Sequence, residues 1–235
     1  MRDALIITRR SLRNLWDEFA FLIALNVLWT LDLLLVAVPL FGLRNAGPGW
    51  VLGLALLILL PLPALSAGLC FVANQVTRGV AVGWGTFAAG VRRYWAKAFV
   101  VALTNTAVLF LIALNIRFYM VVIESQWAVI AVTAWAVVAL YWLLAQLFWF
   151  PMLLEMKEEK LFLALRHALG LVIVTPGFSI ALGLVVALLI AACVVLTVPA
   201  ALFLAVLLML IANHATRSRI AHARRQPYDP DGTSS

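Results

Sequence analysis

The stretch that decides the fold is Phe178–Asn213, which reads FSIALGLVVALLIAACVVLTVPAALFLAVLLMLIAN and contains no charged residue. As one helix at 1.5 Å per residue it would be about 54 Å long, nearly twice the roughly 30 Å hydrocarbon core of a bilayer. Thr197-Val198-Pro199 interrupts it near the middle, because proline cannot continue a regular helix. We therefore predict two short membrane helices joined by a tight apolar hairpin.

Four more apolar runs of membrane length precede this stretch, at about 19–41, 50–73, 99–119 and 127–150. Pro61 and Pro63 lie inside the second run and predict a kinked or broken helix there, and Pro151 is expected to close the fourth run. Together these runs predict an all-α, polytopic membrane helix bundle of about six transmembrane helices. We expect a single transmembrane domain over 1–220 and a disordered cytoplasmic tail over 221–235.

Composition excludes a soluble globular domain. The chain has 235 residues, of which 66% are hydrophobic and 11% are charged, and its mean hydropathy is +1.08. Soluble domains carry roughly 45–50% apolar and about 25% charged residues. Too little polar surface is therefore encoded to coat a sphere that faces water.

The net charge of +7 is explained by membrane topology. With six spans and the N-terminus inside, only Arg44 and Arg117 lie outside, which leaves about fifteen of the 17 Lys and Arg residues inside. With five spans, about eleven Lys and Arg residues would lie inside and about six outside, which fits the excess of positive charge on the cytoplasmic side less well. We therefore expect a multi-pass protein of the cell membrane with both termini in the cytoplasm. A nucleic-acid partner is not expected, because no folded basic domain is encoded.

Two segments between the spans have amphipathic patterns. In the first, 80–99, aromatic and basic side chains occupy different arcs at 100° per residue, which predicts a helix in the membrane interface that contacts the lipid bilayer and anionic lipid headgroups. The residues concerned are Trp84, Phe87, Arg92, Arg93, Trp95 and Lys97. The alternative is that this segment only extends the third span into the cytosol.

The second segment, 155–167, begins with charged residues and continues with leucines at helical spacing, with Arg166 off the leucine stripe. Each segment follows a span, contains or precedes a glycine (Gly90, Gly170) and leads into another span. This order is compatible with an internal repeat of the kind found in some transporters.

Polar residues inside the spans are the candidates for intramembrane sites. Asp32 is the main one, because an ionisable group at membrane depth costs several kcal/mol, and Arg117 is its expected partner. This pair would be either a structural salt bridge or an ion- or proton-coupled transport site. The uncharged candidates either hydrogen-bond between helices or line a polar cavity. They are Asn26, Asn105, Asn115 and Gln146.

No pattern of catalytic or metal-ligating residues occurs. Cys70 and Cys193 lie apart in apolar runs and are expected to be core thiols, and His167, His214 and His222 are too scattered to bind a metal. No metalloprotease, nucleophile-elbow or P-loop motif is present. We therefore expect no cofactor, no metal and no enzymatic activity.

Several local motifs occur together in a familiar order. They are LNVLW at 25–29, PALSAGL at 63–69, RRYW at 92–95, NIRFY at 115–119 and ALRHA at 164–168. Over about 12–220 the chain resembles the YesL-like family of bacterial membrane proteins, and it departs from that family in the extra length between Asp32 and Leu60. The resemblance implies a multi-pass protein of the bacterial inner membrane without established chemistry, some members being associated with carbohydrate uptake. It supplies no catalytic residues.

Three functions follow as hypotheses. The first is a non-enzymatic accessory or scaffold subunit of a bacterial membrane system, whose segments 80–99 and 155–167 dock a membrane or cytoplasmic protein. The second is a small secondary transporter or channel-like protein with a site near Asp32 and the Pro61/Pro63 break, for which Asp32, Asn105 and Asn115 should face one cavity. The third is a lipid-modifying enzyme, for which His167, His214 or Glu155 should line a pocket at headgroup depth.

Overall fold

The computed structural model describes residues 19–42, 61–122, 126–196 and 198–223, and within these ranges every element of regular structure is a helix. The predicted all-α class is thus confirmed. The residues 43–60, which include the first part of the second expected span, lie outside the described ranges, as do 224–235 of the expected tail, whereas 221–223 belong to the last helix. The helices are α2 (Phe19–Gly42), α4 (Pro61–Val76), α5 (Trp84–Val122), α6 (Gln126–Glu155), α7 (Leu161–Val174), α8 (Pro176–Leu196) and α9 (Val198–Ala223).

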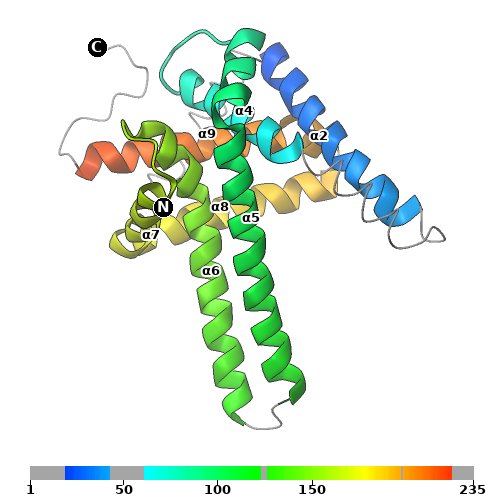
Figure 1. Ribbon diagram of the computed structural model, residues 1–235, viewed down its shortest axis with the longest axis vertical. Coiled ribbons are helices and arrows are strands. Elements are labelled where there is room, and N and C mark those ends of the chain that lie inside the picture. The colour runs from blue at the N-terminus through cyan, green and yellow to red at the C-terminus, as the bar shows by residue number, and fades with distance from the viewer. Residues whose placement is uncertain (1–18, 43–60, 123–125, 197, 224–235) are drawn as a thin grey trace.

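The longest feature is an antiparallel hairpin of α5 and α6, which projects from the rest of the molecule (Figure 1). The other helices gather around the end where α5 begins and α6 ends, and α8 and α9 run across the hairpin in this view. The projecting part exposes large apolar side chains, such as Phe110 at 62% and Trp127 at 75%. Surfaces of this kind are stable only in lipid or against another protein.

Three described helices are long and apolar enough to cross a membrane, namely α5, α6 and the part of α8 from Pro176 to Cys193. Hence the chain has the character of a helical membrane protein. The α8–α9 pair forms the expected hairpin, because α8 ends at Leu196 and α9 begins at Val198, next to Pro199. The total of six spans stays a prediction.

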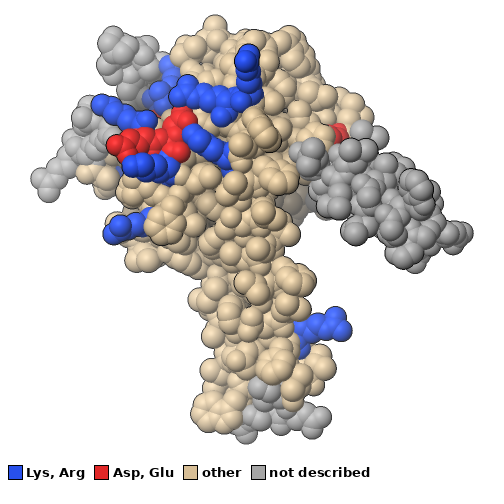
Figure 2. Space-filling view, in the orientation of Figure 1, with Lys and Arg blue, Asp and Glu red and all other residues tan. Residues whose placement is uncertain are grey.

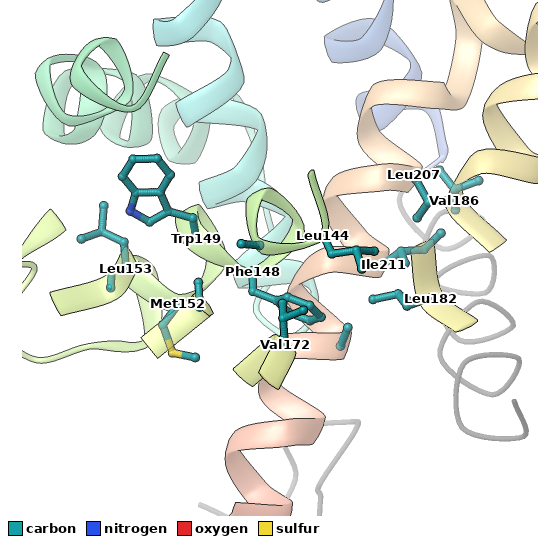
Figure 3. Packing of buried hydrophobic residues seen from close by; sticks show 14 residues of the cluster. Leu144, Phe148, Trp149, Met152, Leu153, Val172, Leu182, Val186, Leu207 and Ile211 are labelled. Atoms are coloured by element: carbon teal, nitrogen blue, oxygen red, sulfur yellow. The ribbon is translucent and has the colours of Figure 1, made fainter. Parts of the chain in front are cut away.

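The core is built around α9, which contacts both groups of helices. One side packs with α6, α7 and α8 in a cluster that includes Phe148, Leu182 and Ile211 (Figure 3). A second cluster joins α9 to α2 and α4 through residues such as Leu25 and Leu210. Since lipid is as apolar as these side chains, close packing and interhelical hydrogen bonds hold such contacts together.

Helices α4 and α5 touch closely at two glycines. A Cβ on Gly90 would lie 2.8 Å from Phe71 Cβ, and a Cβ on Gly68 would lie 2.6 Å from side-chain atoms of Phe87 and Val91. The glycines are therefore small-residue contacts that let the two helices approach.

Three expectations about element boundaries need correction. The segment 80–99 is not a separate interfacial helix, because α5 is continuous from Trp84 to Val122, so the structure forms the alternative, an extension of the third span. Pro151 does not close the fourth span and lies inside α6. The two presumed repeat segments also differ, because α7 is a separate helix and Gly170 faces open space, unlike Gly90.

Candidate functional site

Charged side chains gather at one end of the molecule, where α5 begins and α6 ends (Figure 2). We call this region the basic end. Its described members are nine cations, Arg78, Arg92, Arg93, Lys97, Lys157, Lys160, Arg166, Arg217 and Arg219, and three anions, Glu155, Glu158 and Glu159. Arg117 lies twenty residue steps beyond Lys97 on α5, which corresponds to about 30 Å, the thickness of the hydrocarbon core.

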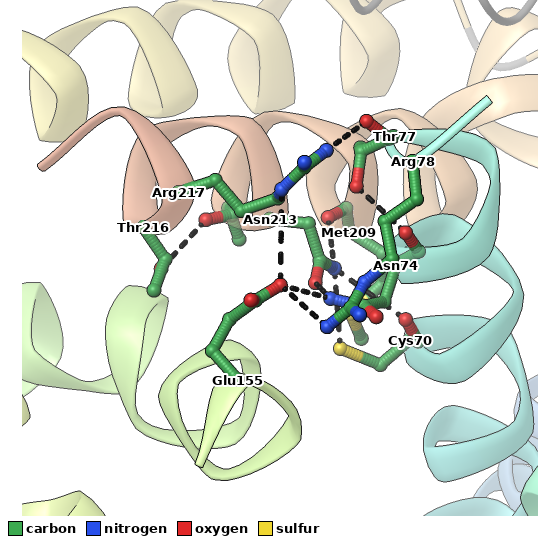
Figure 4. Close-up of polar contacts among 10 residues, drawn as sticks. Cys70, Asn74, Thr77, Arg78, Glu155, Met209, Asn213, Thr216 and Arg217 are labelled. Atoms are coloured by element: carbon green, nitrogen blue, oxygen red, sulfur yellow. Dashed lines mark hydrogen bonds and ion pairs between the residues drawn. The ribbon is translucent and has the colours of Figure 1, made fainter. Parts of the chain in front are cut away.

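Glu155, the last residue of α6, collects donors from α4 and α9 (Figure 4). Its Oε1 accepts a hydrogen bond from Asn74 Nδ2 at 2.8 Å and forms an ion pair with Arg78 at 3.1 Å. Arg217 Nε lies 3.9 Å from the same oxygen. A carboxylate at a helix C-terminus is unfavourable beside the helix dipole, and these two guanidinium groups offset that effect.

Two fully buried asparagines extend this network from Glu155 into the interior of the protein. Asn74 Nδ2 also donates to Asn213 Oδ1 at 3.1 Å, and Asn213 Nδ2 donates to the Met209 carbonyl at 2.8 Å. Asn74, Arg78, Glu155, Asn213 and Arg217 together form what we call the Glu155 cluster, which ties α4, α6 and α9 into one unit.

The chain path after α4 brings the cluster together. Gly79 has φ 72°, a conformation that glycine adopts freely, and Val80 N donates to the Gln75 carbonyl across the turn. Arg217 donates to the Thr77 carbonyl, so a cation from α9 caps the negative end of α4.

Glu159 joins the loop after α6 to the start of α5. Its carboxylate accepts hydrogen bonds from Arg93 and from Tyr94 Oη, each at 2.6 Å, and from Lys97 Nζ. Burial raises the pKa of Glu159, but the hydrogen bonds from Lys97 and Tyr94 and the charges of Lys97 and Arg93 outweigh this effect and hold the pKa below its usual value. We call these four residues the Glu159 cluster.

The two segments expected to form the working surface are thus brought together. The Glu159 cluster connects segment 80–99 to segment 155–167 although the linked residues are more than sixty positions apart in the sequence. Three exposed cations of these segments, Arg92, Lys157 and Arg166, take part in none of the ion pairs found among the described residues.

A hollow of about 680 Å³ opens at the basic end. Its floor is apolar, formed by residues such as Met152 and Leu171, and its polar lining includes Glu155, His167 and Arg219. Of the three residues expected at headgroup depth, His167 and Glu155 line this hollow, whereas His214 is buried in α9 and is not among the lining residues.

The intramembrane candidates do not form one site. Asp32 is buried in α2, and its Oδ2 has no hydrogen-bond partner in the described part of the chain. Arg117 is exposed near the far end of α5, and neither residue occurs in an ion pair within these ranges, so the expected salt bridge is wrong. The pair fails because α2 packs on α9 and α4 beside the basic end. Asn115 Nδ2 donates to Leu111 O of its own helix.

Two of the remaining polar candidates, Asn26 and Asn105, form hydrogen bonds between helices. Asn26 is fully buried, and its Oδ1 accepts a hydrogen bond from the backbone N–H of Val206 at 3.1 Å, which connects α2 to α9. Asn105 Oδ1 accepts from Trp142 Nε1 at 2.9 Å, which connects α5 to α6. Asn105 and Gln146 line a common pocket, whereas Asp32 and Asn115 do not.

The aromatic residues expected to lie in lipid headgroups divide into two groups. Trp84 and Trp95 are exposed, whereas Phe87 is buried between α4 and α5. Phe87 therefore belongs to the core.

Sequence reasoning missed the Glu155 cluster, although a signal for it exists. Asn74 and Asn213 each precede an arginine by four residues, Arg78 and Arg217, at the ends of apolar runs. In a helix this spacing brings an amide and a guanidinium to the same face. In the structure Asn213 and Arg217 both lie in α9, whereas Arg78 lies in the turn directly after α4, and both pairs reach the one carboxylate of Glu155.

No protein-family model, curated protein or solved structure matches the chain. The resemblance to the YesL-like family therefore stays a prediction, and function has to be inferred from the geometry.

Proposed function

We propose that the protein is a non-enzymatic accessory or scaffold subunit of a bacterial membrane system, and that the cytoplasmic side of its basic end docks a partner protein with an acidic surface. The observation that carries this proposal is the union of segments 80–99 and 155–167 by the Glu159 cluster. The union leaves Arg92, Lys157 and Arg166 exposed, and the ion pairs among the described residues do not neutralise them.

Charge supports a docking role. Glu155 and Glu159 each pair with neighbouring cations, and Arg92, Lys157 and Arg166 are exposed cations that take part in none of the ion pairs of the described residues. Exposed cations steer an acidic partner toward its binding site and select against basic partners. The family resemblance suggests a carbohydrate-uptake system as the assembly that this subunit serves.

The test is co-purification of the full chain from gently solubilised membranes, followed by mass spectrometry. The triple variant Arg92→Gln, Lys157→Gln, Arg166→Gln is compared with the control Arg117→Gln, which removes a cation from the opposite end. We expect a stable companion with wild type and with the control, and its loss with the triple variant. Equal recovery of the companion with all three proteins would refute the proposal. It would also be refuted if the triple variant lost only its co-purifying anionic lipid and kept the companion protein.

The hollow at the basic end favours a lipid-modifying enzyme as a second candidate, because His167 lines it beside an apolar floor. Against this candidate, Glu155 Oε1 accepts the hydrogen bond from Asn74 and pairs with Arg78, and a proton taken up by the carboxylate would weaken both contacts. Incubation of the protein with phospholipid vesicles tests it: release of headgroups by wild type, lost in His167→Ala, would favour the enzyme.

The transport alternative is the weakest of the three. It requires Asp32, Asn105 and Asn115 to face a common cavity, and these residues are separated as described above.

A further inference from the structure

A pocket of about 230 Å³ lies between α4, α5, α6 and α9, on the membrane side of the basic end. Most of its lining is apolar and includes Pro63, Ala102 and Phe150. An apolar cavity of about 150 Å³ accommodates a benzene ring, so this pocket has room for one ring with small substituents.

The polar atoms of the pocket present hydrogen-bond donors. Trp142 Nε1 donates to Asn105 Oδ1, and Trp29 Nε1 donates to Ser66 Oγ, each at 2.9 Å. Each indole occupies one of the two lone pairs of these oxygens, and the amide group of Asn105 and the hydroxyl group of Ser66 still have protons that they can donate.

Gln146 adds a third donor. Its Nε2 is buried and has no hydrogen-bond partner in the structure described. A buried donor without an acceptor costs about 1–3 kcal/mol, so an acceptor supplied by a ligand would remove an unfavourable interaction.

The depth of these donors limits the source of the acceptor. Asn105 lies eight residue steps from Lys97 and Gln146 lies nine steps from Glu155, so both amides are about 12–14 Å from the charged level. Half of a bilayer core is about 15 Å. Phospholipid ester groups lie at the boundary of the core, whereas a freely dissolved lipophile reaches this depth.

We propose that this pocket binds a neutral, membrane-soluble molecule with carbonyl oxygens, of the size of a single substituted ring such as a quinone. The carbonyl oxygens accept hydrogen bonds from Gln146, Asn105 and Ser66, and the ring packs against the apolar lining. This site is independent of the docking function, because it involves none of the exposed cations.

The test is equilibrium binding of radiolabelled decylbenzoquinone to the full chain in detergent micelles, with decylbenzene as the matched probe without oxygens. We expect saturable binding of the quinone and at least about fivefold weaker binding of the hydrocarbon, as the loss of one to two hydrogen bonds implies. Gln146→Leu should weaken quinone binding about fivefold to tenfold, and Asn115→Leu, which removes an amide outside the pocket, should not change it.

Equal affinity for the two probes in wild type would overturn the proposal without reference to any variant, and so would an unchanged affinity in a folded Gln146→Leu protein. A third arm adds phospholipid as a competitor. If diester phospholipid displaced the quinone and diether phospholipid did not, the occupant of the pocket would be a lipid ester. This result would overturn the proposal that a freely dissolved lipophile binds there. Loss of companion proteins in the docking experiment leaves each of these results unaffected.

Discussion

Replacement of Glu155 by leucine should destabilise the protein by about 2–4 kcal/mol. The hydrogen bond from buried Asn74 to the carboxylate contributes about 1.5–3 kcal/mol, as is usual when the acceptor is charged. The ion pair with Arg78 adds only about 0–1 kcal/mol, because the side chain of Arg78 is 39% exposed. Glu155→Gln keeps an oxygen for Asn74 and loses only the charge, so we expect a smaller effect of about 1 kcal/mol.

The matched control is Glu158→Leu. Glu158 lies three positions away and pairs with Lys160, but its side chain is 69% exposed, so we expect a change below about 0.5 kcal/mol. The assay is the free energy of unfolding in mixed micelles as the fraction of denaturing detergent rises. Unfolding of Glu155→Leu and Glu158→Leu at the same detergent fraction would show that the Glu155 cluster contributes no net stability.

Three more outcomes are expected. Gly90→Ala should destabilise relative to Gly85→Ala by about 1–3 kcal/mol, because a Cβ at Gly90 meets α4 whereas one at Gly85 meets open space; equal unfolding transitions would contradict this packing. The folded-state pKa of Glu159 is lowered, so its stabilising effect should be fully present above the usual value of about 4.5 and be lost as pH falls through the folded-state pKa. Acid unfolding of Glu159→Gln should therefore be less steep than that of wild type, and identical pH profiles would argue against it. Asn26→Leu should cost about 1–2 kcal/mol, measured by thermal unfolding, because the interhelical hydrogen bond between α2 and the N–H of Val206 is lost; an unchanged unfolding transition would contradict this.

The helices and the break between α8 and α9 could be predicted because they follow from chain-local properties. Apolar length requires a helix in lipid, since every backbone group must be satisfied within the segment, and Pro199 marks the interruption. The same reasoning placed the limits of α2 within a residue of those observed.

The errors arose where tertiary contacts override a local signal. The amphipathic pattern of 80–99 predicts a separate interfacial helix, but Gly90 lies where α5 touches Phe71 of α4, and α5 continues without a break into the third span. Pro151 stays inside α6 because the buried cluster around Phe148 and Met152 holds both sides of the helix. Such contacts involve partners remote in the sequence, which no local pattern identifies.

The candidate site was predictable in part. Its two segments were identified from their charges, but which glutamate meets which cation depends on the packing of α4 and α9 against the end of α6. The Asp32–Arg117 pair was inferred from the cost of isolated charges in lipid, and it fails because that argument contains no information about which helices are neighbours.

We expect the α5–α6 hairpin to cross the bilayer with its basic end inside the cell. Single cysteines at Arg92 and Arg117, in a chain whose Cys70 and Cys193 are replaced by alanine, test it with a membrane-impermeant maleimide on intact cells. The account predicts that Arg117→Cys is labelled at once and that Arg92→Cys is labelled only after the membrane is opened. Labelling of Arg92→Cys from outside intact cells would contradict it.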